Sequence, residues 1–406
     1  VRVDVTELAA YVADGALVDL GPWFDADPTW DEAEYFRAPL DAMRAPGGGL
    51  LGLPQTFTPY VMYVNLDRFD ALGLAPPAAG WTWDDLARLA RAATEDTDGD
   101  GRTDEWGISI TQWLQAVSPW VWQAGGRFLD GSGEASAMGT PEFAGALTFL
   151  HSLLHVERVA SNDATFAAQM EQGLFQAGRA AMYGPVGYWE TYRFQSLPFR
   201  WDVVPLPRGE VEATAVAMGC YVVPRTARDP ELSYRYQREV VAGEAYQRRM
   251  AEIGNGVPGR ISAARSSAFL DPGRAPESEH VFLDVMEHAR FLPPSANWAK
   301  IESLCAPELE GVLLSGRLDP AEAARAMAAK TDAYLTRTRE RAGRPRLHGF
   351  ALTGSVVASL LLFLGIALLP RRPRGPGAAR EERRAWLMLA PWAIGFVAFL
   401  LGPAAV

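Results

Sequence analysis

The segment LGLPQTFTPYVMYVNLDRFDALGL, residues 51–74, contains one of the short apolar strands that alternate with helices along the first 336 residues. That strand candidate is Met62–Val64. The others follow at intervals along the chain: Trp106–Ser109, Ala181–Tyr183, Trp201–Val204 and Val216–Val223. Alternation of strands and helices is typical of α/β domains. A chain of 406 residues has room for about two or three such domains.

The helices between these strands carry clear start signals. Thr82 precedes WDDLARLARAAT, which has acidic residues in its first turn, and Thr140 with Pro141 opens PEFAGALTFLHSLLH. Asp319 and Glu322 form a capping box at the start of PAEAARAMAAKTDAYL, with proline in the first turn. The sequence therefore predicts capped helices at these three places.

Charge is divided between an acidic body and a basic tail. Of the 38 lysines and arginines, 11 lie between Arg337 and Arg384, a stretch that holds only 3 of the 49 acidic residues. An acidic body repels nucleic acid and anionic lipid, so nucleic acid is not an expected partner. The basic tail is typical of a segment that lies beside a membrane.

The basic tail contains two apolar runs. Residues 350–369 are 20 residues without a charge, and such a helix is about 30 Å long, the thickness of the hydrocarbon core of a bilayer. We therefore expect a transmembrane helix over 347–370, a basic cytoplasmic linker over 371–385 and the start of a second span over 386–406. Arginines flank the first span on both sides, so their count does not set its orientation. Folded acidic domains are carried across regardless of charge, so residues 1–346 are expected outside the cell membrane.

The second apolar run resembles the first transmembrane segment of sugar-type ABC importer permeases. In RRAWLMLAPWAIGFVAFLLGPA, basic residues precede an apolar stretch with Pro391-Trp392, Gly395-Phe396 and a closing Gly402-Pro403. In that family the N-terminus of the permease is cytoplasmic, which agrees with the topology above. The resemblance covers this stretch alone and implies that a permease begins here.

Seven segments of the body, in order, resemble the extracellular solute-binding proteins of carbohydrate ABC importers, the class that includes maltose-binding proteins. They are AAYVADGALVDL; LGLPQTFTPYVMYVNLDRFDALGL; WTWDDLARLARAATEDTDGDGRTDEWGI; WVWQAGGRFLD; LFQAGRAAMYGPVGYW; VVPLPRG with AVAMGCYVVPRTARDPELSYRYQREVVAGEAYQRRMAEIGNGVPGR; and NWAKIESLCAPELEGVLLSGRLDPAEAA. The resemblance implies a periplasmic-binding-protein-like α/β fold of two lobes, with the ligand in the cleft between them. The opening strand–helix–strand of the family is missing, so the chain is expected to begin inside lobe one.

The same resemblance implies where the lobes begin and end. Lobe one is expected to hold residues 1–57 and 208–292, and lobe two residues 58–207. Residues 293–340 are expected to form C-terminal helices that pack across both lobes. The expected chain crossings lie near Thr56–Tyr60, Pro205–Pro207 and Leu292–Trp298.

Aromatic candidates for the binding site come from the same segments. A flat aromatic ring buries the C–H face of a sugar while polar neighbours satisfy its hydroxyls. Five tryptophans lie in segments that face the cleft in the family: Trp113, Trp120, Trp122, Trp189 and Trp298. Trp189 follows the turn MYGPVGY and Trp298 opens a helix after LPPSAN, so we expect both in the site, together with Trp113. For each tryptophan the alternative is a place in the core.

Glycine and polar positions complete the expected site. Gly184 and Gly219 end or interrupt strands, where a ligand can approach the backbone, although a simple turn or bulge explains them equally. Tyr221 shares a strand face with Gly219. Arg260 offers a planar fork of donors to hydroxyls or to an anionic group; its alternative is a surface salt bridge. Hydroxyls at the first crossing are expected from Thr56, Thr58 and Tyr60.

The stretch DTDGDGRTDEW, residues 96–106, resembles the start of an EF-hand-like calcium loop, in which acidic residues alternate and a glycine follows. Gly107 stands where an EF-hand has its bidentate glutamate, which argues against a site. The alternative is a solvated acidic turn. We predict a structural Ca²⁺ here and no cofactor for function. The predicted ligands are Asp96, Asp98, Asp100 and Asp104.

Other reactive side chains give weaker signals. His151 and His155 are one helical turn apart in HSLLH, as in zinc-binding helices, but no third ligand is apparent. Cys220 and Cys305 either pair or stay free in the interior. The sequence has no G-x-S-x-G elbow, P-loop or C-x-x-C motif, so no enzyme is indicated.

Together these features predict the substrate-binding component of an ABC importer. Its lobes would close about a hinge on a carbohydrate or polyol and deliver it to a fused permease, while a separate subunit hydrolyses ATP. The alternatives left open are a membrane-anchored glycoside hydrolase, a membrane-anchored sugar sensor and a tethered receptor without a permease.

Overall fold

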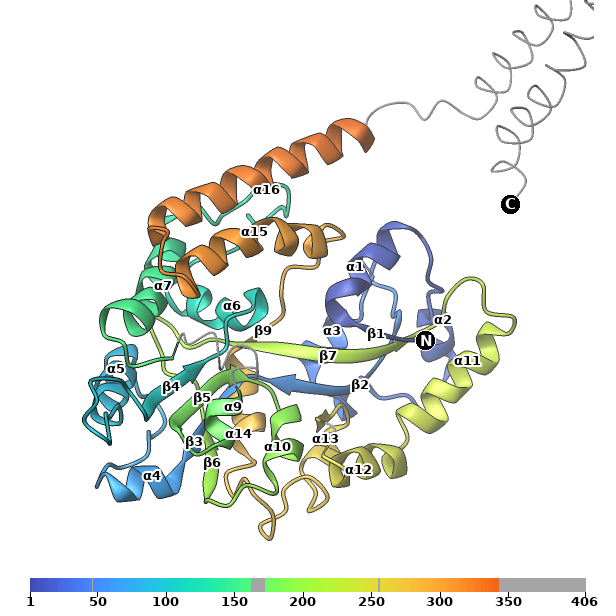
Figure 1. Ribbon diagram of the computed structural model, residues 1–406. Helices are drawn as coiled ribbons and strands as arrows, with labels where there is room; N and C mark the ends of the chain where they lie inside the picture. The colour runs from blue at the N-terminus through green and yellow to red at the C-terminus, as the bar shows by residue number, and fades with distance from the viewer. Residues whose placement is uncertain (46, 162–171, 255, 343–406) are drawn as a thin grey trace, which may run out of the picture. The chain divides into compact units, whose positions relative to one another are not determined.

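The computed structural model describes residues 1–45, 47–161, 172–254 and 256–342. Val1–Arg339 form one compact unit that contains two β-sheets with helices around them (Figure 1). The expected membrane span, basic linker and permease-like segment, over 347–370, 371–385 and 386–406, lie outside the described residues. Among the residues that are described, no helix is long and apolar enough to cross a membrane.

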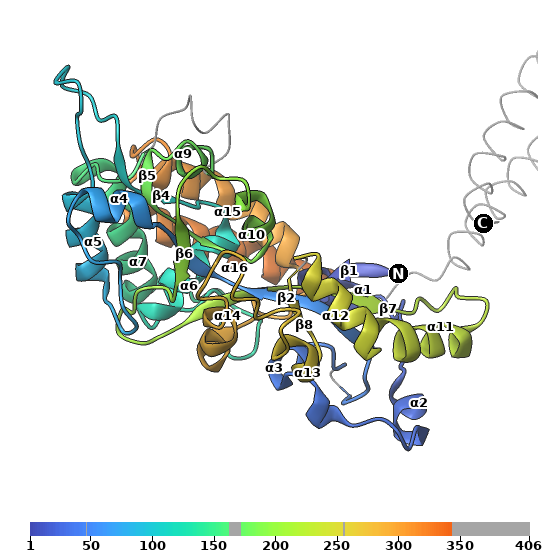
Figure 2. The same cartoon turned by 90° about the horizontal axis from the view of Figure 1, so that it is seen from below.

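The sheet of lobe one runs in the order β1 (Arg2–Asp4), β7 (Thr214–Val222), β2 (Gly52–Pro59) and β8 (Val257–Pro258). These neighbours are antiparallel, and β9 (Ala289–Arg290) adds a parallel pairing with β7. The long strands β2 and β7 run side by side through the middle of the molecule (Figures 1 and 2). Because β7 lies between β1 and β2, residues far apart in the sequence become neighbours on one sheet face.

The sheet of lobe two runs in the order β4 (Trp106–Ile110), β5 (Ala180–Val186), β3 (Val61–Asn65) and β6 (Trp201–Val204). Met62 and Val64 of β3 belong to one hydrophobic cluster, and Val61 and Tyr63 belong to another. Alternate residues of a strand point to opposite faces, so this sheet is buried on both sides. That double burial explains why β3 reads as a continuous apolar run.

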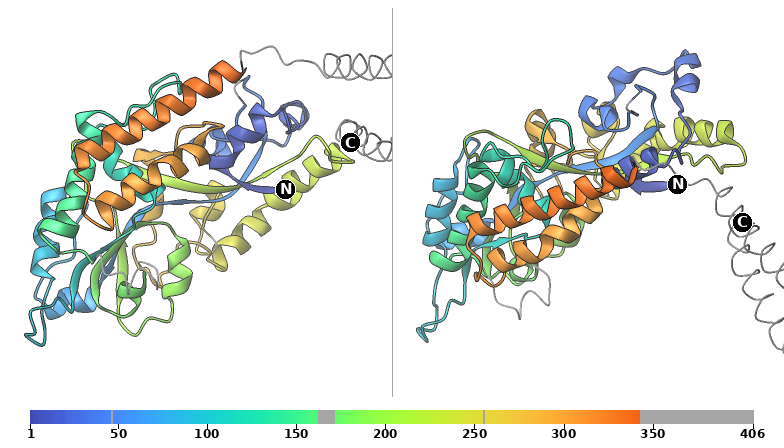
Figure 3. Two further views of the ribbon diagram at one scale, coloured as in Figure 1. Left: turned by 45° about the horizontal axis from the view of Figure 1, so that its top comes forward. Right: turned by 90° about the horizontal axis from the view of Figure 1, so that it is seen from above.

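Helices cover both sheets, and Figure 3 shows the last two lying side by side at one edge of the molecule. The described helices and helical turns are α1 (Val5–Ala13), α2 (Gly21–Ala26), η1 (Glu32–Glu34), α3 (Arg37–Asp41), α4 (Leu66–Ala71), α5 (Trp83–Ala92), α6 (Leu114–Gln123), α7 (Pro141–His151), η2 (Ser152–Val156), α9 (Gln172–Gln176), α10 (Trp189–Phe194), α11 (Pro230–Tyr236), η3 (Gln237–Val241), α12 (Glu244–Glu252), α13 (Ile261–Ala264), α14 (Val281–Asp284), η4 (Val285–His288), α15 (Trp298–Leu313) and α16 (Pro320–Ala342).

The predicted helix starts are confirmed. Thr82 and Asp85 form a reciprocal capping box at α5, and the Thr140 hydroxyl accepts the amide of Phe143 at α7. At α16 the Asp319 carboxylate accepts the amide of Glu322 at 3.0 Å. These contacts satisfy amides that have no partner within the helix.

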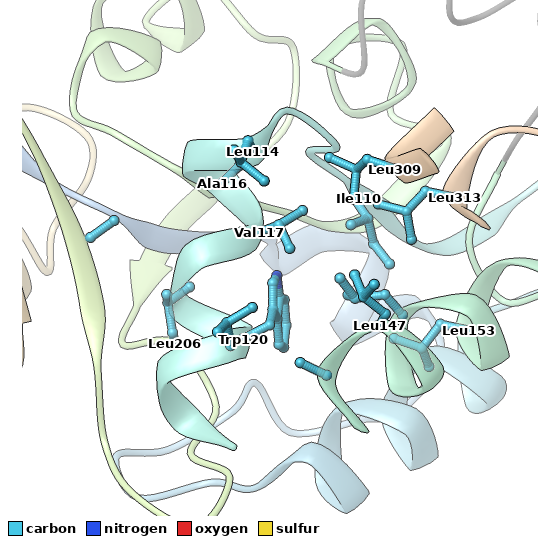
Figure 4. Close-up of a cluster of buried hydrophobic side chains, with 14 of the residues drawn as sticks. Ile110, Leu114, Ala116, Val117, Trp120, Leu147, Leu153, Leu206, Leu309 and Leu313 are labelled. Atoms are coloured by element: carbon cyan, nitrogen blue, oxygen red, sulfur yellow. The ribbon is translucent and has the colours of Figure 1, made fainter. Parts of the chain in front are cut away.

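The core of lobe two includes the C-terminal helices. Val117 and Trp120 of α6 pack with Leu147 of α7 in one buried cluster, and Leu309 and Leu313 of α15 belong to the same cluster (Figure 4). Because α15 and α16 contribute to this core, they are an integral part of lobe two. α15 also contacts α1 of lobe one.

The chain passes from lobe one to lobe two at Tyr60, between the end of β2 at Pro59 and the start of β3 at Val61. It returns between β6 and β7, and it passes a third time between β9 and α15. The amide of Tyr60 donates to the carbonyl of Ala215 at 2.9 Å, so the first passage is hydrogen-bonded to the returning strand. The domain boundaries given above stay predictions.

Candidate functional site

A cavity of about 210 Å³ lies where the two lobes meet. Strands of lobe one supply most of its wall, and the start of α10 in lobe two supplies an indole. Its lining residues are Arg2, Asp4, Thr56, Thr58, Trp189, Ala217, Met218, Gly219 and Gly256. Four of the predicted site residues, Thr56, Thr58, Trp189 and Gly219, are therefore brought together.

The floor of the cavity is made by three neighbouring strands. Gly219 of β7 pairs with Asp4 of β1 on one side and with Thr56 of β2 on the other. A Cβ at Gly219 would lie 2.7 Å from Cζ of Arg2, so the missing side chain makes room for the Arg2 guanidinium. The sequence analysis expected a ligand to occupy that space.

Arg2 and Asp4 each use only part of their hydrogen-bonding capacity within the protein. Nε of Arg2 donates to Oε1 of Gln55 at 3.1 Å. Oδ1 of Asp4 caps α1 by accepting the amide and the hydroxyl of Thr6 at 2.9 and 2.6 Å. Among the described residues, no further hydrogen bond or ion pair holds either side chain. One fork of donors and one carboxylate oxygen are thus free for a ligand.

Lobe two contributes the indole of Trp189 to the lining, and close contacts hold this indole in place. The ring of Tyr60 meets it edge-on, with 5.6 Å between centroids. Gly187 has no side chain that could displace the indole, because a Cβ there would overlap both the Trp189 ring and Oγ1 of Thr58. The Thr58 hydroxyl accepts the backbone amide of Tyr188. The indole is therefore fixed before any ligand arrives.

A buried charged group anchors Tyr188, the residue before Trp189. The Tyr188 hydroxyl donates to Glu279, which also forms an ion pair with Arg274 at 3.0 Å. The Tyr188 ring packs against Phe269 and Phe282. Burial outweighs these contacts and raises the pKa of Glu279. The turn that carries Trp189 is thereby tied to the segment that leads to the third chain crossing.

Tyr60 and Trp113 do not line the cavity. The Tyr60 side chain is buried, and Trp113, which precedes α6, is 38% exposed. Burial raises the pKa of Tyr60, and the charges of Asp4 and Glu302 add to the rise.

The sequence analysis missed Arg2, Asp4 and Gly256, which line the cavity, and it did not consider Glu302, which lies outside the lining. Glu302 of α15 is partly buried and has no hydrogen bond or ion pair within the described chain, and burial raises its pKa. The sequence spacing indicates that Glu302 lies on the buried face of α15. It is four residues after Trp298 and three before Cys305, which are both buried on this helix. Arg2 and Asp4 gave no local signal, since their place depends on pairing with β7.

Trp298, Gly184 and Tyr221 also lie outside the cavity lining. Trp298 is 4% exposed and packs edge-on against Phe128 in the core of lobe two, with 5.5 Å between ring centroids. A Cβ at Gly184 would lie 2.7 Å from the carbonyl oxygen of Val61, so this glycine serves strand packing. Tyr221 is the next residue beyond Gly219 on the same strand face.

Partners inside lobe one hold Arg260. Its guanidinium forms ion pairs with Glu34 at 2.6 Å and with Glu244 at 3.1 Å, and it donates to the carbonyl of Ala242 at 3.2 Å. The ion-pair alternative thus describes this residue. Trp120 and Trp122 are buried in the core of lobe two.

The acidic loop between α5 and β4 projects away from lobe two (Figure 2). Carboxylate oxygens of Asp96, Asp98 and Asp104 all lie within 4.8 Å of one another, a spacing that suits Ca²⁺. Asp100 is not part of this group, and its carboxylate accepts the amide of Arg102 at 2.8 Å. Three of the four predicted ligands therefore fit one cation.

The remaining reactive groups have structural contacts. Nε2 of His155 is 2.9 Å from the carbonyl oxygen of Leu313, and the ring lies beside that of His151. Cys220 and Cys305 are both free and buried, so they do not pair.

A larger surface hollow of about 560 Å³ lies on lobe one between α2 and α11. Trp23 and Tyr234 stack beside it, and Arg238 pairs with Asp27 at its edge at 2.8 Å. Lobe two contributes no residue to its lining, so closure of the lobes cannot enclose a ligand there.

Comparison with known proteins agrees with this geometry. Residues 1–237 match the family model described as "Bacterial extracellular solute-binding protein". A search of curated protein sequences gave no match.

Several solved structures share the fold. The ABC substrate-binding protein Lmo0181 from Listeria monocytogenes, in complex with cycloalternan, is 23% identical, with a TM-score of 0.75 over 82% of this chain and 84% of that one. The sugar-binding protein MalE from Xanthomonas citri is 19% identical, with a TM-score of 0.71 over 85% of each chain. Maltose-bound MalE3 of T. maritima is 18% identical, with a TM-score of 0.67 over 82% and 83%. The two lobes, the cavity between them and the match over residues 1–237 lead to one conclusion: this chain belongs to the bacterial extracellular solute-binding protein family.

Proposed function

We propose that this chain captures a carbohydrate or polyol between its lobes and delivers it to an ABC importer, without catalysing a reaction. The observation that carries the proposal is the composition of the cavity wall. One indole from lobe two lines the same cavity as hydroxyl, carboxylate and guanidinium groups of lobe one. Sugars need this combination, because a ring has an apolar C–H face and a polar edge.

The charges around the cavity support a neutral ligand. Arg260, the residue suggested for an anionic group, is neutralised by Glu34 and Glu244. Arg2 and Asp4 both line the cavity from one strand face, so their opposite charges offset each other there. A phosphate or carboxylate would lie beside the Asp4 carboxylate that lines the cavity, so a sugar phosphate or a sugar acid is disfavoured.

In the proposed mechanism the lobes close about their chain crossings. Trp189 belongs to lobe two and the hydroxyl-bearing floor to lobe one, so closure brings the indole onto a ring that already lies on the floor. The closed form is then presented to the transporter, in which a separate subunit hydrolyses ATP.

The proposal includes attachment to the membrane and to a permease. The apolar runs at 347–370 and 386–406, with basic residues between them, support a chain that crosses the membrane and continues as a permease. Such a fusion raises the effective concentration of receptor at its pore. Residues 1–346 would lie outside the membrane and 371–385 in the cytoplasm.

Isothermal titration calorimetry tests the binding proposal. The full chain, kept in mild detergent because of its apolar tail, is titrated with neutral sugars, polyols, sugar phosphates and short peptides. We expect a neutral sugar or polyol to bind with a Kd in the micromolar range or below. Binding of a peptide or a sugar phosphate in place of every neutral sugar and polyol would overturn the proposal.

Protease accessibility tests the topology. Protease added to intact bacterial spheroplasts that express the chain should remove residues 1–346, and an epitope tag inserted in the cytoplasmic linker at 371–385 should stay protected and remain in the membrane fraction. A body that becomes accessible only after lysis would contradict this arrangement.

A further inference from the structure

The turn that carries the Trp189 indole is held by two strands. Trp189 begins α10, a helix of six residues whose N-cap, Tyr188, makes no side-chain capping hydrogen bond. The hydroxyl of Thr58 in β2 accepts the amide of Tyr188, and the carbonyl of Gly187 accepts the hydroxyl of Tyr63 in β3 at 3.1 Å. These contacts fix the backbone of the turn and leave the Tyr188 side chain to be placed by other groups.

The Tyr188 side chain is placed by Glu279, which lies 91 residues further along the chain. Both side chains are buried, and the Tyr188 hydroxyl donates to Oε1 of Glu279. Phe269 and Phe282 pack against the tyrosine ring, with 5.2 and 4.9 Å between centroids. Because a buried hydroxyl is costly to leave without a partner, this hydrogen bond sets the position of the ring.

Glu279 is itself held rigidly. Its Oε2 accepts the amide of Asp271 at 3.2 Å, and its Oε1 also accepts from Arg274 at 3.0 Å. The neighbouring Ser278 donates to Asp202 of β6 with its amide, at 2.9 Å, and with its hydroxyl, at 2.7 Å. The carboxylate is therefore a fixed support for the tyrosine.

Arg274 extends this network to another helix. Its guanidinium donates to the carbonyl of Glu252, the last residue of α12, at 3.2 Å, and to the carbonyl of Phe269 at 3.3 Å. A continuous path of polar contacts thus runs from α12 of lobe one, through Arg274 and Glu279, to the start of α10 in lobe two.

Neither stability nor ligand contact accounts for this network. The desolvation of a buried ion pair often exceeds the attraction between its charges, so apolar side chains of similar size could serve the fold as well. Burial outweighs the contacts of Glu279, as its raised pKa shows. Tyr188, Arg274 and Glu279 all lie outside the cavity lining. What the network provides is one defined position for the residue before the indole.

We propose that Glu279 is a positioning residue of the binding site, which holds the Trp189 indole in its binding orientation through the Tyr188 hydroxyl. The inference rests on the proposed function in one respect, namely that the indole contacts the sugar. Glu279 and Tyr188 touch no sugar and act only through Trp189. Without the link, the indole takes other orientations, and a smaller fraction of molecules is ready to bind.

A double-mutant cycle tests the link. The full chain in detergent is titrated by calorimetry with glucose, maltose, cellobiose and sorbitol. Tyr188→Phe removes only the hydroxyl and should weaken the tightest of these complexes about fivefold. In a chain that already carries Trp189→Ala, the same substitution should change the affinity by less than about twofold, because the side chain through which it acts is gone. A loss of equal size in both backgrounds would refute the proposal.

The indole can also be followed without any sugar. In the full chain labelled with 5-fluorotryptophan, the fluorine resonance that disappears in Trp189→Phe belongs to Trp189. Tyr188→Phe should shift or broaden this resonance and leave that of Trp120, which is buried in the core of lobe two, unchanged. A Trp189 resonance that does not respond would overturn the proposal whether or not a sugar binds.

Two variants assign the effect to Glu279. Glu279→Leu removes the acceptor of the Tyr188 hydroxyl and should reproduce the loss of affinity. Glu279→Gln keeps an acceptor and should restore most of it, whereas equal losses in the two variants would contradict a role for this hydrogen bond. If the leucine variant fails to fold, Tyr188→Phe decides, because it leaves the ion pair with Arg274 in place.

Tyr234 offers a matched control on lobe one. Its hydroxyl donates to Asp27 at 3.2 Å, and Asp27 forms an ion pair with Arg238 at 2.8 Å, so the same kinds of side chain meet outside the cavity lining. Tyr234→Phe should lower the melting temperature as Tyr188→Phe does, while the sugar affinity stays within about twofold and the Trp189 resonance does not move. An equal loss of affinity in this control would mean that the effect is general destabilisation.

The outcomes separate this inference from the function on which it rests. If none of the four compounds binds, the proposed function loses its support, and the fluorine resonance still decides whether Tyr188 positions the indole. If a sugar binds and Tyr188→Phe alters neither its affinity nor the Trp189 resonance, the positioning role alone is refuted.

Discussion

Trp189 and Trp298 are the same residue type in two different roles. Both follow a turn and both begin a helix, yet Trp189 lines the cavity while Trp298 is buried against Phe128. Their surroundings decide the difference. Gly187 and Thr58 leave Trp189 exposed to the space between the lobes, whereas α15 turns Trp298 into the core of lobe two.

Removing each indole should therefore have a different effect. Trp189→Ala should weaken binding of the sugar at least about tenfold, because the stacking surface is lost. Trp298→Phe should leave the affinity of the folded protein unchanged and lower the free energy of unfolding by about 1–3 kcal/mol, because it leaves a space in the core. Calorimetry measures the first effect and thermal denaturation the second. Equal loss of affinity in both variants would contradict the assignment.

Glu279 is a buried carboxyl group, and burial disfavours its ionised form. Its pKa is raised in the folded state, so the folded protein holds this proton more tightly than the unfolded chain does. The resulting stability is present below the ordinary carboxyl pKa of about 4.3 and is lost as the pH rises through the folded pKa.

Glu279→Gln should reveal this pH dependence. Glutamine has nearly the same size and still accepts from Tyr188, but it cannot ionise. The melting temperature of the variant relative to wild type should therefore increase from pH 4 to pH 7. Thermal melts at both pH values measure this difference. A difference that is constant or falls with pH would show that the Arg274 ion pair dominates.

At the scale of elements, β2 and β7 determine the site. The segment at 51–74 was expected to hold one strand, yet it holds two, β2 and β3. Pro54 and Pro59 obscured β2, because proline cannot donate to a ladder and usually marks a strand end. In the structure the register of β2 on β7 shifts between Pro54 and Thr56, and this irregularity accommodates the first proline.

The acidic loop between α5 and β4 gives a prediction at the same scale. Ca²⁺ should raise the melting temperature by a few degrees, as expected for a ligand at about one hundred times its Kd. Asp98→Asn should abolish this shift, since Asp98 belongs to the group of three carboxylates.

Asp100→Asn is the matched control for that loop. It lies in the same turn and outside the group, so its variant should keep the shift. Melts with Ca²⁺ and with a chelator decide between the two outcomes. A shift that survives Asp98→Asn would disprove the site.

At the scale of the whole molecule, ligand binding should couple the two lobes. A sugar held between them should slow amide hydrogen exchange in β1 and β7 of lobe one and also around Tyr188 and Trp189 in lobe two. Mass spectrometry of exchanged peptides measures this protection. Protection confined to one lobe would mean that the lobes do not close on the ligand.

More of the fold than of the site could be predicted from the sequence. Strand periodicity and helix caps are local, so β3 to β7 and the starts of α5, α7 and α16 could be predicted. The resemblance of several segments to a known family predicted four residues of the lining: Thr56, Thr58, Trp189 and Gly219. Arg2 and Asp4 could not be predicted as site residues. They lie in the cavity only because they pair with Tyr221 and Gly219, which are distant in the sequence.

The two cysteines have a practical consequence. Cys220 lies in β7 of lobe one and Cys305 in α15 of lobe two, and burial raises their pKa to about 12 and about 11. Thiolates are the species that react with maleimides, so both native thiols should resist modification while the protein is folded. One cysteine introduced on the surface of each lobe could then carry a fluorophore without removal of either native residue. The distance between the two dyes would report opening and closing of single molecules.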